Sequence, residues 1–168
     1  MHDEILSPEQ KDLLPLVKQF SDKFGLVGGT AVALHLGHRR SIDFDLFTLN
    51  DFDVEAVKNK IRAKYRIISV PTELVNQLTV LAEGVKFTFY KYPFPITFSE
   101  LFANIIKISD LLTLAAMKAS ALGGRAKWKD YVDLYFIFQG LSLEEITGKA
   151  KGLFAGEFNE KLFREQLS

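Results

Sequence analysis

Residues of two kinds alternate along "SIDFDLFTL" (41–49), with Ile42, Phe44 and Leu46 on one predicted face and Asp43, Asp45 and Phe47 on the other. This period-two pattern predicts a β-strand with one buried face and one polar face. Alternating or continuous apolar runs predict five further strands, at 24–28, 66–70, 77–83, 85–92 and 104–108. Glu83 and Gly84 fit the turn of a hairpin between two of these strands.

Apolar residues at helical spacing, preceded by capping residues, predict helices at 8–23, 30–36, 54–64, 110–122 and 157–167. Two more helices are expected, one within 125–139 and one after the capping box formed by Ser142 and Glu145. Gly37 suits a left-handed helix end, and the glycine pair at 123–124 should end the helix before it.

Strand signals dominate from 24 to 108 and helix signals follow, with the proline-punctuated "YPFPITFSELF" (92–102) as an irregular connection. We therefore expect an α/β (α+β) fold, with a mixed sheet and flanking helices in 1–108 and a C-terminal helical part in 109–168 packed on it as one compact unit. The chain has 168 residues, 48% of them hydrophobic and 15 of them phenylalanine, which is enough for a substantial core.

Charge and composition narrow the class of protein. The 21 basic and 21 acidic residues cancel, which argues against a protein that coats nucleic acid through its overall charge. There is no cysteine, so disulfides, thiol nucleophiles and cysteine-based zinc sites are excluded. The polar N-terminus and the lack of a long apolar run predict a cytoplasmic protein without a membrane segment.

Two acidic residues on the predicted strand at 41–49 are candidates for a metal site. Side chains two positions apart project from the same face of a strand, so Asp43 and Asp45 can converge on one divalent cation or on two that lie close together. Two carboxylates side by side repel each other, and Mg²⁺, which prefers oxygen ligands, removes that penalty.

A glycine pair precedes this strand by one short helix. Gly28 and Gly29 lead into the N-terminus of that helix, where free backbone N–H groups favour an anion such as phosphate. Thr30 adds a hydroxyl at the helix start. Phosphate donors and metal ligands on consecutive elements together suggest a site for a metal-bound nucleotide.

The stretch "GGTAVALHLGHRRSIDFDLF" resembles the first two motifs of the AbiEii/AbiGii toxin family of minimal nucleotidyltransferases, which are related in fold to DNA polymerase β. A second region, "DLLTLAAMKASALGGRAKWKDYVDLYFI", is similar to the lysine, the arginine and the basic-Asp-x-x-Asp helix of that family. The motif regions cover less than a third of the chain. The resemblance implies a nucleotidyltransferase-fold sheet with a helical part after it.

The resemblance also implies the site residues. The catalytic residues would be Asp43, Asp45, Lys118 and Asp130, with Asp43 and Asp45 as the metal ligands. The nucleotide- and phosphate-binding residues would be Gly28, Gly29, Thr30, Arg39, Ser41 and Arg125. The cofactor would be Mg²⁺, with Mn²⁺ as a possible substitute.

The implied reaction moves a nucleoside monophosphate from a nucleoside triphosphate to an acceptor hydroxyl. The acceptor implied by the resemblance is RNA, with the 3′ end of a tRNA as one candidate, and a protein is the alternative acceptor. The protein would then act as the toxin of a toxin–antitoxin or abortive-infection system, with its cognate antitoxin encoded nearby.

Residue chemistry alone leaves several roles open in the second region. Lys118, in an otherwise apolar helix, must either extend to solvent or find an anionic partner. Arg125 could bind phosphate or be structural, and Trp128 could stack on a base or pack. Asp133 and His38 have no assigned role, although His38 could order its loop or contact phosphate.

One feature departs from the polymerase-β pattern. Such enzymes usually carry a third carboxylate on a later strand, but the outward positions of "VKFTFY" are Lys86, Thr88 and Tyr90. Either Asp130 substitutes for that acid, or the metal alone activates the acceptor, or catalysis is lost. The alternative function is therefore a nucleotide- or RNA-binding pseudoenzyme, and a metal-dependent nuclease is a third possibility.

Overall fold

A seven-stranded mixed sheet forms the body of the protein in the computed structural model, which describes residues 1–124 and 127–167. The strand order among these residues is β3-β4-β5-β2-β1-β7-β6. The strands are β1 (Gly25–Val27), β2 (Asp43–Thr48), β3 (Ile67–Leu74), β4 (Gln77–Ala82), β5 (Val85–Lys91), β6 (Glu100–Phe102) and β7 (Ile106–Ile108).

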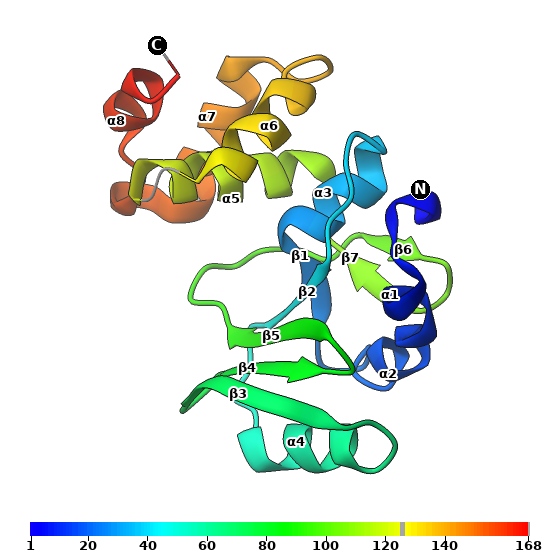
Figure 1. Cartoon of the computed structure of the whole chain (residues 1–168). Helices are drawn as coiled ribbons and strands as arrows, with labels where there is room; N and C mark the ends of the chain where they lie inside the picture. The colour runs from blue at the N-terminus through cyan, green and yellow to red at the C-terminus, as the bar shows by residue number, and fades with distance from the viewer. Residues whose placement is uncertain (125–126, 168) are drawn as a thin grey trace.

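Helices lie on both sides of this sheet and beyond one end of it (Figure 1). Those within the first part are the 3-10 helix η1 (Asp3–Ile5), α1 (Pro8–Asp12), α2 (Leu14–Lys18), α3 (Gly28–Leu36) and α4 (Val54–Arg62). Those that follow the last strand are α5 (Leu111–Gly124), α6 (Trp128–Ile137), α7 (Leu143–Phe154), the 3-10 helix η2 (Ala155–Glu157) and α8 (Glu160–Glu165). Figure 1 shows α5 to α8 grouped together over the end of the sheet that carries α3.

Strand β2 lies in the middle of the sheet, antiparallel to β1 and parallel to β5. From Asp43 onwards its residues alternate as the sequence predicts, because Phe44 and Leu46 are fully buried while Asp43 and Asp45 are only partly buried. Ile42 was also expected on the buried face, but it lies before the start of the strand and is 59% exposed. The sheet therefore has one apolar face and, at its centre, one face that carries carboxylates.

Aromatic side chains fill the apolar face of the sheet. Phe44, Phe87 and Phe89 are fully buried, and the rings of Phe20 and Phe24 make edge contacts with Phe89 at centroid distances of 4.8 and 5.3 Å. Burial of each such ring contributes roughly 2–3 kcal/mol, so this layer holds the central strands rigidly in place.

The N-terminal segment differs from the single helix predicted at 8–23. It forms two five-residue helices, α1 and α2, which meet at Leu13. Pro15 is the cause, because a proline is tolerated in the first turn of a helix but not in its interior. The predicted N-terminal cap is confirmed, since Ser7 and Gln10 form a capping box around Pro8.

The connection at 92–102 also differs from the prediction of irregular structure. Its last residues form β6, which pairs antiparallel with β7 in a short hairpin. The two residues that follow β6, Ala103 and Asn104, both have positive φ and make the turn, although neither is glycine. The turn signal in the sequence is weak there, because Asn104 adopts this conformation comparatively readily but an alanine such as Ala103 rarely does.

The helix ends follow the sequence more closely. Gly37 ends α3 in the left-handed conformation with φ of 66°, and Ser142 caps α7 in a capping box with Glu145. Helix α5 runs to Gly124, two residues beyond the predicted end. Within residues 1–124 and 127–167, the helices are all too short or too polar to span a membrane.

Candidate active site

A cavity of about 780 Å³ separates the polar face of the sheet from helices α5 and α6. Residues of both halves of the chain line it. The polar and glycine residues of its wall are Gly28, Gly29, Arg39, Ser41, Asp43, Asp45, Lys86, Thr88, Lys118, Lys127, Lys129 and Asp130. The apolar and aromatic residues are Val27, Phe47, Tyr92, Leu114, Met117, Ala121 and Trp128.

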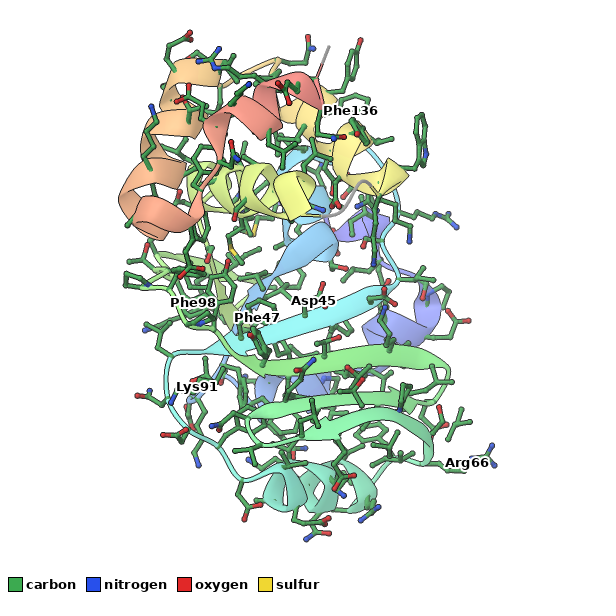
Figure 2. All side chains as sticks on the ribbon, turned by 90° about the vertical axis from the view of Figure 1, so that its left-hand side faces the viewer. Asp45, Phe47, Arg66, Lys91, Phe98 and Phe136 are labelled. Atoms are coloured by element: carbon green, nitrogen blue, oxygen red, sulfur yellow. The ribbon has the colours of Figure 1, made fainter. Side chains whose placement is uncertain are left out.

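The two carboxylates of β2 face this cavity together with Phe47. Figure 2 shows Asp45 and Phe47 rising from the strand into the space between the sheet and the helices above it. Gly28 contacts Asp45 directly: a Cβ on Gly28, whose φ is +73°, would lie 2.1 Å from Asp45 Oδ2. Only glycine therefore allows this close approach of the turn to the carboxylate.

Burial raises the pKa of the Asp45 carboxyl above its ordinary value, and the neighbouring charge of Asp43 raises it further. The charges of Lys86 and Lys118 and the hydroxyl of Thr88 oppose this shift without cancelling it. A bound cation would stabilise the ionised form of this buried carboxyl group, so the environment of Asp45 favours cation binding.

The N-terminus of α3 is open toward the cavity. No side chain of residues 1–124 or 127–167 caps the helix, and its first turn contains no acidic residue. A Cβ on Gly29 would lie 2.7 Å from Arg39 Nη2 and 3.2 Å from Ser41 Oγ, so both polar side chains stand beside this helix end. This part of the cavity wall therefore combines free backbone N–H groups, the positive end of the helix dipole and a guanidinium group. All three favour a bound anion.

Thr30 has a different place from the predicted phosphate contact. Its side chain is 1% exposed and does not line the cavity. The hydroxyl donates to the backbone oxygen of Asp43 and lies 3.0 Å from Ser41 Oγ. Thr30 therefore fixes β2 against α3, and its hydroxyl is already used inside the protein.

Lys118 finds two anionic partners instead of extending to solvent. Its Nζ lies 2.6 Å from Asp130 Oδ1 and 2.7 Å from Asp133 Oδ2, and its side chain is 11% exposed. An ammonium group has three N–H donors, so one donor of Lys118 remains for a ligand in the cavity. Asp130 Oδ2 is buried and has no hydrogen-bond partner within the described residues.

Asp133 connects the loop after α3 to the helical part. Its fully buried carboxylate accepts hydrogen bonds from His38 Nε2 at 2.8 Å and from Arg39 Nε and Nη2 at 2.6 and 2.9 Å. Burial alone would raise the pKa of Asp133, but these hydrogen bonds and the charge of Lys118 outweigh it and hold the pKa well below the ordinary value. His38 thus orders its loop, which the sequence left as one of two options.

The cavity wall also includes Lys86, Lys127 and Lys129, for which no role in ligand binding was predicted. Lys86 Nζ lies 2.6 Å from Asp43 Oδ2. Lys127 and Lys129 flank the cavity beside Trp128, a residue that is 78% exposed and so does not pack in the core. The basic stretch "RAKWK" makes Lys127 and Lys129 recognisable in the sequence. No local sequence pattern predicts that Lys86 pairs with Asp43. Arg125 lies outside the described residues.

The donor set suits a hard divalent cation. The described residues contain no cluster of three or more histidine or acidic side chains, so Asp43 and Asp45 would be the protein's own ligands. Mg²⁺ commonly takes one or two carboxylates and completes its shell with water and phosphate oxygens. The raised pKa of Asp45 and the adjacent open helix end agree with such a site.

Solved structures with a similar chain trace show which fold this is. A candidate nucleotidyltransferase from Helicobacter pylori superposes with a TM-score of 0.61 at 15% identity, over 94% of this chain and 89% of that one. The antibiotic-resistance factor ANT(2'')-Ia, solved with adenylyl-2''-tobramycin, gives 0.57 at 12% identity over 95% and 97%. The Megavirus polyadenylate synthase gives 0.57 at 11% over 78% and 31%. The protein therefore has a nucleotidyltransferase fold, as the sequence predicted.

One relative by sequence is 33% identical to this chain, over 87% of it and 74% of the relative. It is the uncharacterized protein aq_aa25 of Aquifex aeolicus, and this chain belongs to the same family. No family model matches the chain, so membership of the AbiEii/AbiGii family stays a prediction.

Proposed function

We propose that this protein is a metal-dependent nucleotidyltransferase that moves a nucleoside monophosphate from a nucleoside triphosphate to an acceptor hydroxyl. The observation that carries the proposal is one cavity in which an uncapped helix N-terminus at Gly28 and Gly29 adjoins two carboxylates, Asp43 and Asp45. The fold supports the same class of reaction.

The triphosphate would bind at the N-terminus of α3, where the N–H groups of Gly28 and Gly29 are available to it. Lys118 would donate its remaining N–H to a phosphate oxygen, and Arg39 and Ser41 would contribute charge and a hydroxyl from the adjacent wall. Because carboxylates hold Lys118 and Arg39 in place, their charges are positioned before the substrate arrives.

Asp43 and Asp45 would hold Mg²⁺, or Mn²⁺ in its place. When bound, this ion neutralises charge on the triphosphate oxygens. Between them the two side chains offer four carboxylate oxygens at the cavity wall, one of which contacts Lys86. The described residues of the wall offer no third acid on β5, where Thr88 pairs with Asp45 in the strand register.

Asp130 is our candidate for the group that accepts the proton of the acceptor hydroxyl. Its side chain lines the cavity, and its buried Oδ2 has no hydrogen-bond partner among the residues that the structure describes. As the hydroxyl oxygen forms its bond to the α-phosphorus, its proton would pass to Asp130, and the bond to the pyrophosphate oxygen would break. Lys118, bound to the other oxygen of Asp130, keeps that oxygen occupied and orients the group.

RNA is the acceptor that we propose, with tRNA as a candidate, in the setting of a toxin controlled by a neighbouring antitoxin. The resemblance to the AbiEii/AbiGii family supports this. Two exposed lysines, Lys127 and Lys129, and the exposed ring of Trp128 at the cavity wall also support it, since basic and aromatic side chains together bind single-stranded nucleic acid.

A transfer assay tests the proposal. The protein is incubated with Mg²⁺, each labelled nucleoside triphosphate in turn and total RNA, and we expect label to move to RNA. Asp43→Asn and Asp45→Asn should each abolish the transfer. Asp51→Asn is the matched control, because Asp51 is an exposed acid outside the cavity whose partners are Lys91 and Asn76, and it should leave transfer unchanged.

The alternative function, a nucleotide- or RNA-binding pseudoenzyme, has one observation in its favour. The strand beside the carboxylates carries Lys86 and Thr88 where an acid would be expected. Nucleotide binding without transfer to RNA would support this alternative, and RNA shortening without any nucleotide would indicate a nuclease. For the toxin role, expression of the chain alone should slow growth, and normal growth with ample protein would contradict it.

A further inference from the structure

Strand β5 places a lysine opposite the first carboxylate of the site. Strands β2 and β5 are parallel neighbours, and their register pairs Asp43 with Lys86 and Asp45 with Thr88. On both strands these residues lie on the partly buried face, whereas the residues between them are buried. Lys86 therefore projects into the same cavity as the two carboxylates.

Lys86 and Asp43 form a close ion pair, with 2.6 Å between Nζ and Oδ2. The pair is only partly covered, since 44% of the Lys86 side chain and 27% of the Asp43 side chain are exposed. The charge of Lys86 also counteracts the repulsion that Asp45 experiences from Asp43. Its ammonium group therefore offsets the negative charge of both carboxylates, as a bound metal cation would.

We propose that Lys86 is a built-in counter-ion that competes with the metal for Asp43 and moves to the triphosphate when nucleotide and metal bind together. This inference rests on the proposed function. A lysine has a flexible stem and three donors, so it can exchange a carboxylate for a phosphate oxygen without movement of the backbone. Binding of the metal and binding of the triphosphate are then coupled. The protein binds a free divalent cation weakly and a metal–triphosphate complex strongly.

Lys86→Met tests the coupling because it removes the charge and retains most of the length of the side chain. Binding of Mn²⁺ alone, followed by electron paramagnetic resonance, should tighten about fivefold, the scale of a partly exposed ion pair. Binding of the Mn²⁺–tripolyphosphate complex, followed by calorimetry, should weaken about fivefold, because the lost contact with the multiply charged phosphate outweighs the pair with Asp43 that no longer has to be broken. Tripolyphosphate serves as the probe since it depends on no nucleobase.

Two further variants act as controls. Lys86→Arg keeps the charge and should keep Mn²⁺ binding weak, as in the wild type. Lys91→Met makes the same change on the same strand, at an exposed lysine that pairs with Asp51 outside the cavity, and should alter neither affinity. Figure 2 shows Lys91 well away from Asp45.

The outcomes separate this inference from the proposed function. Opposite changes of the two affinities in Lys86→Met support the counter-ion role. If Mn²⁺ binding is unchanged or weaker in Lys86→Met but lost in Asp43→Asn, the counter-ion role is wrong and the metal site stands. If Asp43→Asn leaves Mn²⁺ binding unchanged as well, the metal site itself is wrong.

Discussion

Replacement of Asp133 by asparagine tests whether the cavity depends on its buried charge network. The substitution keeps the shape of the side chain but removes the charge shared by His38, Arg39 and Lys118. Each oxygen of Asp133 accepts two contacts, so in either orientation the new amide group would point its N–H donors at donors of the protein.

The cost can be estimated from burial. Breaking a buried ion pair costs about 3–5 kcal/mol when a charge is left without a partner. The Asp133 side chain is fully buried, but Lys118 keeps Asp130 as a partner and 16% of the Arg39 side chain is exposed. We therefore expect a loss of about 3 kcal/mol in the free energy of unfolding, at the lower end of that range.

Urea denaturation at neutral pH measures this loss. With a slope of about 2 kcal/mol per molar urea, the midpoint should fall by about 1.5 M. Asp51→Asn, at a side chain that is 76% exposed, should leave the midpoint unchanged. A shift below about 0.5 M for Asp133→Asn would refute the view that this network holds the helical part on the sheet.

The pH dependence gives a second measure of the same network. Because the pKa of Asp133 is lowered in the folded protein, its stabilisation is complete above the unfolded pKa of about 3.9 and is lost as the pH falls through the folded value. The difference in stability between the wild type and Asp133→Asn should therefore narrow below about pH 4. A difference that is constant down to acid pH would contradict this reasoning.

Three further predictions concern the cavity. Gly28→Ala should abolish binding of Mn²⁺–tripolyphosphate in calorimetry, whereas Gly84→Ala, at a similar φ of +82° but with open space around it, should cost only about 1–2 kcal/mol of stability and retain binding. Asp45→Asn should raise the free energy of unfolding at pH 7, measured by urea denaturation without metal. The pKa of Asp45 is raised in the folded protein, so ionisation of this carboxyl destabilises the fold as the pH rises above about 3.9, and asparagine cannot ionise. A lower free energy of unfolding in Asp45→Asn would contradict this. Thr30→Val should cost about 1–3 kcal/mol in the same assay, because the carbonyl of Asp43 loses its donor, and Thr30→Ser should restore most of it.

Local patterns were enough to predict the centre of the molecule. The alternation around Phe44 and Leu46 defines which face of β2 is buried, and this places Asp43 and Asp45 on the other face wherever the strand lies in the sheet. Gly37 and the Ser142 capping box set helix ends through contacts within a few residues. Such features are predictable because their causes are close in sequence.

Other features depend on contacts between distant parts of the chain, and only the tertiary structure decided them. The sequence places Lys86 on an outward face, but the parallel register of β5 with β2 makes it the partner of Asp43. Thr30 has the residue type of a phosphate ligand, yet the packing of α3 on β2 turns its hydroxyl inward.

Asp133 is the clearest example of a contact that depends on the fold and not on the local sequence. In sequence it is one of two acids on a helix, without an assigned role, and 94 residues separate it from Arg39. The sequence by itself determined which residues could carry charge and which faces would be buried. The fold decided which charges meet, because an ion pair depends on the distance in space between its groups and not on their separation along the chain.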